Sequence, residues 1–423
     1  MDFFGFPILS VIIFSPVIGI IFISMFRDEG NGTPSKILAL LSSIFTFVLT
    51  LSLWFKFDHS IENFQMVEQY IWISKFNIDY FLGLDGLNFF FFLLISFITP
   101  LTLLGSWNVK ERNWQFQIQM LLLQMGMLGC FAALDVVLFY VFFEVMLVPM
   151  YLLIGIWGGK NRLYATIKFF IYTMFGSLLM LVSLLYTANI YKDLHGDWSF
   201  NIIDWYGMNI PSEIQFWLFI GFAIAFAVKI PIFPLHTWLP DAHYEAPTAG
   251  SVQLAAVMLK FGPYGFLRFA MPVFPAAVYD LAPVFMILAL IGIIYGGLVA
   301  MVQTQIKRLI AYSSVAHMGY IVLGLFALNI QGLSGSWIQM VNHGIVTGAL
   351  FLTVGMIYER THTQEISDYG GVMHTMPKFA VFLVFFSMAS VGLPGLNGFV
   401  GEILAMVGAA RVNIWYGFIA AAG

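Results

Sequence analysis

The sequence has few charged residues and almost no cysteine. Only 9% of its 423 residues are charged, whereas an ordinary soluble domain has about 25%. Hydrophobic residues make up 60% of the chain, and the net charge of -4 gives no indication of a nucleic-acid partner. The single cysteine, Cys130, excludes an intrachain disulfide and a cluster of cysteine ligands. This composition predicts an all-α, polytopic membrane protein.

Motifs for metal or redox chemistry are also missing. The sequence contains no HExxH zinc motif, no Walker phosphate loop and no GxGxxG turn. His236 and His243 flank Asp241, but all three lie in a segment interrupted by prolines. Because no residue group here can carry an electron, we expect no metal and no cofactor in this chain.

Long apolar runs divide the chain into candidate membrane spans of roughly 20 residues each. Lysine and arginine gather in alternate loops, such as Lys110–Arg112 and Lys307–Arg308. This bias predicts that the N-terminus lies on the outer side of the membrane. A further span begins near Val412. The complete spans predicted before it are Phe6–Phe26, Ile37–Phe57, Leu84–Trp107, Phe116–Leu134, Val136–Trp157, Leu163–Ile190, Ile214–Ile230, Ala249–Phe269, Leu281–Val302, Leu309–Leu328, Ile338–Tyr358 and Phe379–Leu393.

Two apolar segments end at prolines. Ala227–Pro234 reads AVKIPIFP, and Ala389–Phe399 reads ASVGLPGLNGF. In hydrocarbon, a broken helix is tolerated only where it packs in protein or lines a wet cavity. Each break lies in the third of five spans counted from Phe116 and from Leu281, so the second set starts from the opposite face, as in an inverted repeat. We therefore predict N-terminal helices in residues 1–110, a first five-helix repeat in 111–275 and a second, inverted repeat in 276–423.

The second break is rich in residues that disfavour a helix. Val391–Gly398 reads VGLPGLNG, and in a helix interior glycine costs about 1 kcal/mol and proline about 3 kcal/mol. We expect a helix that stops near Leu393 and restarts near Phe399. Glu402 should then lie in the first turn of the second piece, where the helix dipole favours a carboxylate.

Few ionisable residues lie within the predicted spans, where a charge costs roughly 2.5–3.5 kcal/mol. Glu144 and Lys229 are similarly deep, and Lys229 adjoins the first break. They can form a switchable proton site, because moving the carboxylate changes the proton affinity of the lysine. The alternative is one fixed ion pair. Lys260 lies too far inside its span to reach the interface and is predicted to relay protons. Lys168 lies near an end of its span, so extension to the interface and a place in the relay both stay open.

His317 and His343 lie inside two successive spans. Ser313 and Thr347 lie one helical turn from these histidines, on the same helical faces. A lone histidine is often a core residue, but histidine also passes protons through either ring nitrogen. With lysines upstream, the relay interpretation is favoured, and Glu402 is the predicted exit. We expect one polar line formed by Lys229, Lys260, His317, His343 and Glu402.

The segments between spans are interpreted as solvated connectors. Asp58–Asp79 and Tyr191–Glu213 are mostly acidic, which fits the predicted outer side. Asp135, at a span boundary, is expected to face a lipid headgroup or a partner chain.

Four stretches together resemble the antiporter-like membrane subunits of respiratory complex I. In chain order they are FFEVMLVPMYLLIGIWGG, KIPIFPLHTWLPDAHYEAPTAGSVQLAAVMLK, QTQIKRLIAYSSVAHMGY and LPGLNGFVGE. The resemblance runs from about Phe81 to Glu402. It is strongest to the M-type chains of bacterial NADH–quinone oxidoreductase, because Glu402 stands where related subunits usually have lysine.

The resemblance implies about fourteen helices, two inverted five-helix repeats with discontinuous helices, and an Mrp-antiporter-like fold that moves protons. FMN, iron–sulfur clusters and quinone are expected in partner subunits, with L-type and N-type neighbours in a bacterial inner membrane. The family normally continues past a thirteenth helix, which implies further residues after Gly423. By motif, the proton relay comprises Glu144 on the fifth helix, Lys229 on the broken seventh, Lys260 on the eighth, the connecting His317 and His343, and Glu402 on the twelfth.

Three functions compete on this sequence. The leading hypothesis is a proton-translocating membrane-arm subunit of NADH:quinone oxidoreductase, which couples quinone reduction elsewhere in the complex to proton pumping. The alternatives are a subunit of a Mrp-type cation/proton antiporter or membrane-bound hydrogenase, and a structural spacer that conducts nothing. Glu402 favours complex I over the antiporter, while Glu144, Lys229 and Lys260 argue against a spacer.

Overall fold

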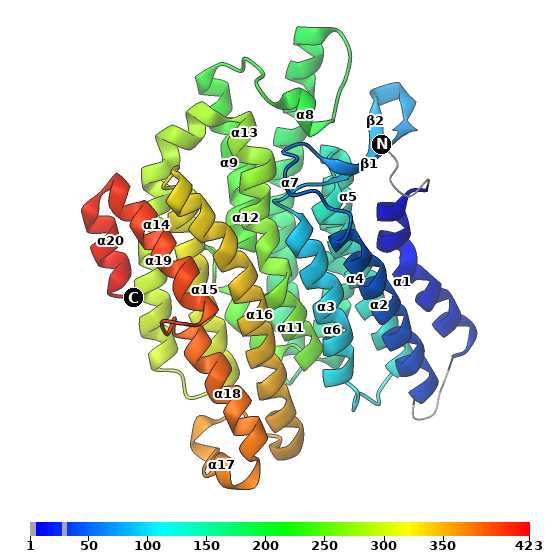
Figure 1. Cartoon of the computed structure of the whole chain (residues 1–423), viewed down its shortest axis with the longest axis vertical. Helices are drawn as coiled ribbons and strands as arrows, with labels where there is room; N and C mark the ends of the chain where they lie inside the picture. Colours follow the sequence, from blue (N-terminus) through cyan, green and yellow to red (C-terminus); the bar gives the residue numbers. More distant parts are fainter. Residues whose placement is uncertain (1–5, 28–31) are drawn as a thin grey trace. The chain divides into compact units, whose positions relative to one another are not determined.

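The computed structural model describes residues 6–27 and 32–423, and this part of the chain is mostly helical (Figure 1). The prediction of an all-α polytopic fold is confirmed, with one added β-hairpin. Within the described residues, eight helical segments are long and apolar enough to cross a membrane. They are α1 (Ile8–Met25), α2 (Thr33–Trp54), the joined α5 and α6 (Val136–Trp157), α7 (Arg162–His195), α9 (Ser212–Lys229), α14 (Pro275–Met301), α15 (Ile306–Leu325) and α16 (Ile330–Thr361).

The other elements complete the described chain. In chain order they are β1 (Gln65–Ile73), β2 (Ile78–Leu84), α3 (Phe89–Gly105), α4 (Asn113–Ala132), α8 (Ile202–Trp205), α10 (Trp238–Glu245), α11 (Thr248–Ala256), α12 (Phe261–Gly265), α13 (Met271–Val273), α17 (Val372–Thr375), α18 (Pro377–Ser390), α19 (Asn397–Val412) and α20 (Ile414–Ala421), with short 3-10 or π turns at Ser74–Phe76, Met258–Lys260, Phe266–Ala270 and Ile366–Asp368.

The chain forms two compact units. Unit 1 holds the residues up to Trp157, Met174–Ala225 and Arg268–Pro275, and unit 2 holds Gly158–Thr173, Phe226–Leu267 and Ala276–Gly423. These units are defined by contacts. The repeat boundaries expected from the sequence, at residues 110/111 and 275/276, therefore stay a prediction.

The segment predicted as an outer loop contains a β-hairpin. Strands β1 and β2 pair antiparallel, with Tyr70 opposite Tyr80. Glu68 of β1 is buried, and its carboxylate accepts from Leu9 N at 2.6 Å and from Ser10 Oγ at 2.5 Å. The first backbone N–H groups of a helix have no partner within it. Glu68 therefore satisfies the start of α1 and attaches the hairpin to that helix.

Helix α3 begins later than the span predicted from Leu84. The chain stays in β2 up to Leu84, and α3 starts at Phe89. Between them, Asp85 N donates to Asn88 Oδ1 at 2.8 Å and Asp85 Oδ1 accepts from Leu87 N at 3.0 Å. These polar groups close a turn before the phenylalanine run, and hydropathy alone does not show that turn.

Asp135 is fully buried in unit 1, so the expectation that it faces lipid or a partner chain is wrong. Its carboxylate accepts from Val137 N at 2.9 Å and Leu138 N at 3.0 Å, which caps α5. It also accepts from Asp79 N of β2 at 3.1 Å. Burial raises the pKa of Asp135 to about 7, although these N–H groups oppose the shift.

In unit 2, glycines let α16 and α19 approach closely. A Cβ on Gly335 of α16 would overlap the backbone of Ala405 in α19, and a Cβ on Gly408 of α19 would overlap Gly332. Small residues allow this close approach of two apolar helices. The packing places the face of α16 that carries His343 beside α19, which carries Glu402.

Asp135 should make stability fall as pH rises. Its pKa is about 7 in the folded protein against an ordinary 3.8, so the unfolded chain releases this proton first and stability drops between about pH 4 and pH 7. We expect Asp135→Asn to remove this contribution. Thermal unfolding of both proteins at pH 5 and pH 8 tests it. The variant should gain on the wild type at pH 8, and an equal difference at both pH values would contradict the argument.

Candidate functional site

The first predicted break lies directly after Lys229. Helix α9 ends at Lys229, and regular helix resumes with α10 at Trp238. The Lys229 side chain is buried, with Nζ 5.8 Å from the centre of the Phe169 ring. The Trp238 indole donates to Val228 O at 2.9 Å and so satisfies a carbonyl at the end of α9. The break also borders an apolar cavity lined by Ile230 and Pro231, among other residues.

Lys260 lies in a distorted part of the chain, where the sequence predicts a continuous helix over Ala249–Phe269. The structure instead has α11, a 3-10 turn at Met258–Lys260, α12 and a π turn. The Lys260 side chain is fully buried, and Nζ donates to Ala255 O. The 3-10 turn changes the helical hydrogen-bond pattern and makes this carbonyl available to the ammonium group. Nζ also lies 2.7 Å from Nδ1 of His343.

The second predicted break is confirmed. Helix α18 ends at Ser390 and α19 begins at Asn397, with positive φ at Gly392 (+75°) and Gly395 (+96°) between them. Both boundaries fall slightly earlier than expected. Because α19 starts at Asn397, Glu402 lies in its second turn and not in its first. Side-chain partners, and not the first turn of the helix, therefore hold this carboxylate.

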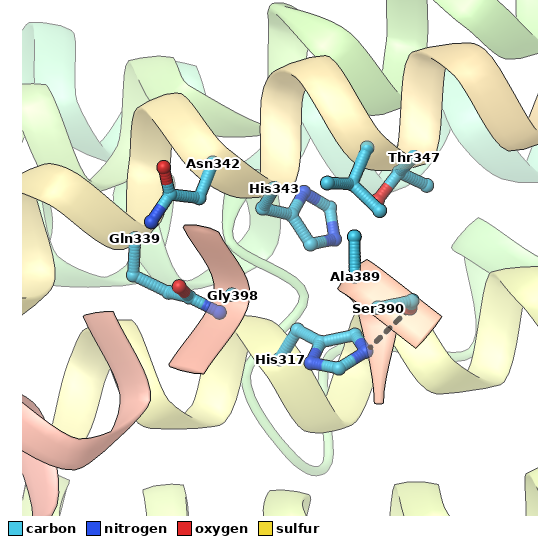
Figure 2. Close-up of a pocket in the computed structure, with 9 residues that line it drawn as sticks. His317, Gln339, Asn342, His343, Thr347, Ala389, Ser390 and Gly398 are labelled. Carbon is cyan, nitrogen blue, oxygen red and sulfur yellow. Dashed lines mark hydrogen bonds between the residues drawn. The ribbon is translucent and has the colours of Figure 1, made fainter. Parts of the chain in front are cut away.

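Glu402 is held by two side chains of unit 2. Its Oε1 lies 2.7 Å from Nδ1 of His317 on α15 and accepts from Nε2 of Gln339 on α16 at 3.0 Å. The second nitrogen of His317, Nε2, lies 3.1 Å from Oγ of Ser390 at the end of α18. Figure 2 shows this last contact as a dashed line. Side chains from α19 and from the end of α18, at the second break, thus converge on the imidazole of His317.

Four residues of the predicted polar line lie near one another in unit 2, but the two histidines stand in the reverse order. Lys260 contacts His343, and the rings of His343 and His317 are 5.9 Å apart between centroids. His317, and not His343, contacts Glu402. The role of these residues as a proton relay stays a prediction. The link from Lys229 to Lys260 stays a prediction.

Lys168 lies in a different group of charges. Its Nζ pairs with Asp241 Oδ2 at 2.8 Å, and the Lys168 side chain keeps 20% of its surface exposed. Arg308 lies 3.9 Å from the other oxygen of Asp241. Because α10 carries Asp241, this ion pair connects the segment after the first break to α7.

The predicted pair of Glu144 and Lys229 spans the two units. Glu144 is a half-buried residue near the end of α5, in unit 1, whereas Lys229 belongs to unit 2. Their pairing stays a prediction.

Two polar residues of this site escape the sequence analysis. Gln339 lies one helical turn before His343, and Ser390 is the last residue of α18 before the break. The helical spacing of Gln339 from His343 was a usable signal. Conversely, the Ser313 hydroxyl makes its hydrogen bond within its own helix, where it donates to Ile310 O at 2.8 Å, and the partners of His317 are Glu402 and Ser390. Thr347 does line the same cavity as His343 (Figure 2).

Known sequences of one family match nearly the whole chain. Residues 133–423 match the family described as "NADH:quinone oxidoreductase/Mrp antiporter, TM". The NADH-quinone oxidoreductase subunit M of Rickettsia prowazekii (strain Madrid E) is 45% identical over 420 residues, which are 99% of this chain and 85% of that protein. The corresponding subunit of Rhodobacter capsulatus is 45% identical over 98% of this chain and 83% of its own length. NADH-ubiquinone oxidoreductase chain 4 of Arabidopsis thaliana is 42% identical over 98% of this chain and 83% of its own.

Comparisons with solved structures show the same fold. A chain of respiratory complex I from Thermus thermophilus with bound NADH superposes with a TM-score of 0.88 at 34% identity, covering 97% of this chain and 84% of that one. A chain of the membrane-bound sulfane sulfur reductase, an archaeal respiratory membrane complex, has a TM-score of 0.83. Its identity is 24%, over 98% of this chain and 67% of that one, so this likeness is one of fold alone.

Gly392 should tolerate alanine less well than Gly395. Both have positive φ, so alanine costs about 1–2 kcal/mol of backbone strain at either position. A Cβ on Gly392 would additionally lie 3.0 Å from Glu402 Oε2, whereas a Cβ on Gly395 has no neighbour within 4 Å in the described residues. Thermal unfolding of the two variants should therefore show the larger loss for Gly392→Ala. Equal losses would mean that contact with Glu402 does not limit this position.

Proposed function

Because the chain belongs to the NADH:quinone oxidoreductase/Mrp antiporter family of membrane proteins, we propose that it is the proton-translocating, M-type membrane subunit of a respiratory NADH:quinone oxidoreductase. The contact series from Lys260 through His343 and His317 to Glu402 carries this proposal. Buried ionisable groups are expensive in a membrane protein and mark ion or proton paths. Here four of them form one series, with a contact of hydrogen-bond length at each end.

Each residue of the series has a chemical role in the proposal. The Lys260 ammonium faces Nδ1 of His343 at 2.7 Å and can pass a proton to it. Nδ1 of His317 and Oε1 of Glu402 share one proton at the other end of the series, also across 2.7 Å. A neutral imidazole accepts a proton on one nitrogen and releases one from the other. The Gln339 amide does not ionise, and it orients Glu402 by donating a hydrogen bond to Oε1.

The energy for transport comes from partner subunits in this proposal. Quinone is reduced elsewhere in the complex, where FMN and iron–sulfur clusters carry the electrons, and this chain performs no redox chemistry. Its neighbours are antiporter-like subunits of the L and N types. The chain crosses a bacterial inner membrane with its N-terminus outside, as the distribution of lysine and arginine favours.

A Mrp-type antiporter subunit or a membrane-bound hydrogenase subunit is the alternative. The family match includes Mrp antiporters, and the fold recurs in the chain of the sulfane sulfur reductase complex. The M-type subunit is favoured because relatives named subunit M are 45% identical to this chain over almost its entire length. Purification of the chain with its partners distinguishes the two: a complex that oxidises NADH and reduces quinone supports the proposal, and a complex without these activities contradicts it.

Glu144 and Lys229 should each be required for pumping. In the proposal both residues belong to the proton relay, so Glu144→Ala or Lys229→Ala removes most NADH-driven proton uptake into inverted membrane vesicles while the complex still assembles. Glu213→Ala is the matched control, because Glu213 is an exposed carboxylate in the first turn of α9, the helix that ends at Lys229. Wild-type uptake in both test variants would refute the role of the pair.

Lys260 and Lys168 should differ in importance. Lys260 is fully buried against His343, whereas Lys168 is partly exposed and paired with Asp241. We expect Lys260→Ala to lower proton uptake more than Lys260→Arg, which keeps a positive charge in place. Lys168→Ala should retain more uptake than either Lys229→Ala or Lys260→Ala in the same vesicle assay. An equally severe defect at Lys168 would show that burial does not rank these lysines.

A further inference from the structure

The contact series has a gap between its two histidines. The ring centroids of His343 and His317 are 5.9 Å apart, and both nitrogens of His317 have other partners. Nδ1 contacts Glu402 and Nε2 contacts Ser390. In this arrangement no nitrogen of His317 is left to receive a proton from His343. A proton that leaves His343 must therefore reach His317 through a third group.

One of the two ring nitrogens of His343 does not contact Lys260. Its Nδ1 lies against Lys260, while Nε2 is buried and has no hydrogen-bond partner among the described residues. His343 as a whole is 3% exposed. Buried polar atoms are nearly always hydrogen-bonded, and water supplies the bond where protein does not. The Nε2 atom is therefore an indication of water beside this ring.

A polar cavity lies where such water is needed. His343, His317 and Ser390 line one cavity at the second break (Figure 2), in which the centre of a water-sized sphere has about 10 Å³ to move. A water molecule fits where such a sphere fits, and it requires two to four polar partners. Asn342 and Thr347 add polar groups to the lining. The cavity thus has the room and the chemistry to hold water between His343 and Ser390.

We propose that Ser390 relays the proton between water in this cavity and Nε2 of His317, so that the path from Lys260 to Glu402 passes through the Ser390 hydroxyl. The inference rests on the proposed proton-translocating function and names a further residue of its path. A hydroxyl suits this position because it donates one hydrogen bond and accepts others. When His317 carries its proton on Nδ1, Ser390 donates to Nε2. When the proton is on Nε2, the Ser390 hydroxyl oxygen accepts a hydrogen bond from that N–H group.

The transfer step balances without any redox partner. A protonated cavity water gives a proton to Ser390 Oγ, and Oγ releases its own proton to Nε2 of His317. The O–H bond of Ser390 is thereby replaced and the hydroxyl is unchanged at the end. His317 then passes the proton on Nδ1 to the carboxylate oxygen Oε1 of Glu402. One proton leaves the water and one arrives on Glu402, and the reverse direction uses the same bonds.

The position of Ser390 in the fold supports this role. It is the last residue of α18, and its hydroxyl lies 3.1 Å from Nε2 of His317. Ser387, one turn earlier in the same helix, is equally half-buried but donates to Leu383 O at 2.7 Å in its own helix. Serine and threonine hydroxyls commonly bond back to the helix in this way. The end of the helix at Ser390 leaves its hydroxyl directed to the histidine instead.

The test compares four variants in the assembled complex, in inverted vesicles. Two quantities are measured. One is the initial rate of proton uptake per complex, and the other is the number of protons taken up per NADH oxidised, which does not depend on the amount of complex. Ser390→Ala removes the relay hydroxyl, and Ser390→Thr keeps one. Ser387→Ala removes the matched hydroxyl that bonds only to its helix, and Glu402→Ala removes the acceptor at the end of the path.

We expect Ser390→Ala to lower the initial rate of proton uptake by about tenfold or more, since a positioned proton-transfer group contributes about 100-fold or more where it limits a step. Protons per NADH should fall in this variant as in Glu402→Ala, while Ser390→Thr and Ser387→Ala stay near the wild type. Normal pumping by Ser390→Ala beside a defective Glu402→Ala would overturn the relay and leave the proposed function standing. A threonine variant no better than alanine, or an equal loss in Ser387→Ala, would also overturn it. Normal pumping in Glu402→Ala would instead refute the proposed function.

Discussion

The burial of the Lys260 ammonium group is the constraint on which the site depends. A fully buried lysine is stable in an apolar interior only if hydrogen-bond acceptors around it replace water. Two groups do so here: the carbonyl of Ala255, made available by a 3-10 turn, and Nδ1 of His343. The first requires a distorted helix around Lys260, and the second requires α16 to pack at the right register. The local irregularity and the helix packing of unit 2 thus serve the same charge.

The two helix breaks meet a related requirement in different ways. Each leaves backbone groups that no helix satisfies, and near each break a side chain from another segment donates to a backbone carbonyl. Trp238 donates to Val228 O at the first break, and Asn342 donates to Asn397 O at 2.7 Å at the second. The surroundings differ, however. The first break borders an apolar cavity, whereas polar side chains line the cavity at the second. Water-dependent proton exchange therefore fits the second break, and Lys229 must use the partners it has in packed protein.

The part of unit 1 around the β-hairpin shows that polar residues near span ends stabilise the structure. Glu68 satisfies the start of α1, and Asp135 caps α5 while it binds the backbone of β2. Both carboxylates are buried. In a chain with so few charges, these carboxylates fix where helices begin, because a backbone donor left without a partner away from water costs about 1–3 kcal/mol. The hairpin is part of this scaffold and is more than a connector.

The sequence by itself determined the membrane character, most of the helices, the two breaks and the identity of the residues from Lys260 to Glu402. These follow from local properties: apolar length, the cost of proline and glycine in a helix, and the rarity of charge in apolar runs. It could not locate the β-hairpin, the start of α3, the distorted helix at Lys260 or the turn that carries Glu402. Only the tertiary structure decided that Ser390 and Gln339 belong to the site and that Asp135 is buried. Their roles depend on atoms contributed by distant segments, and neither hydropathy nor spacing along one helix encodes the direction from which such partners approach.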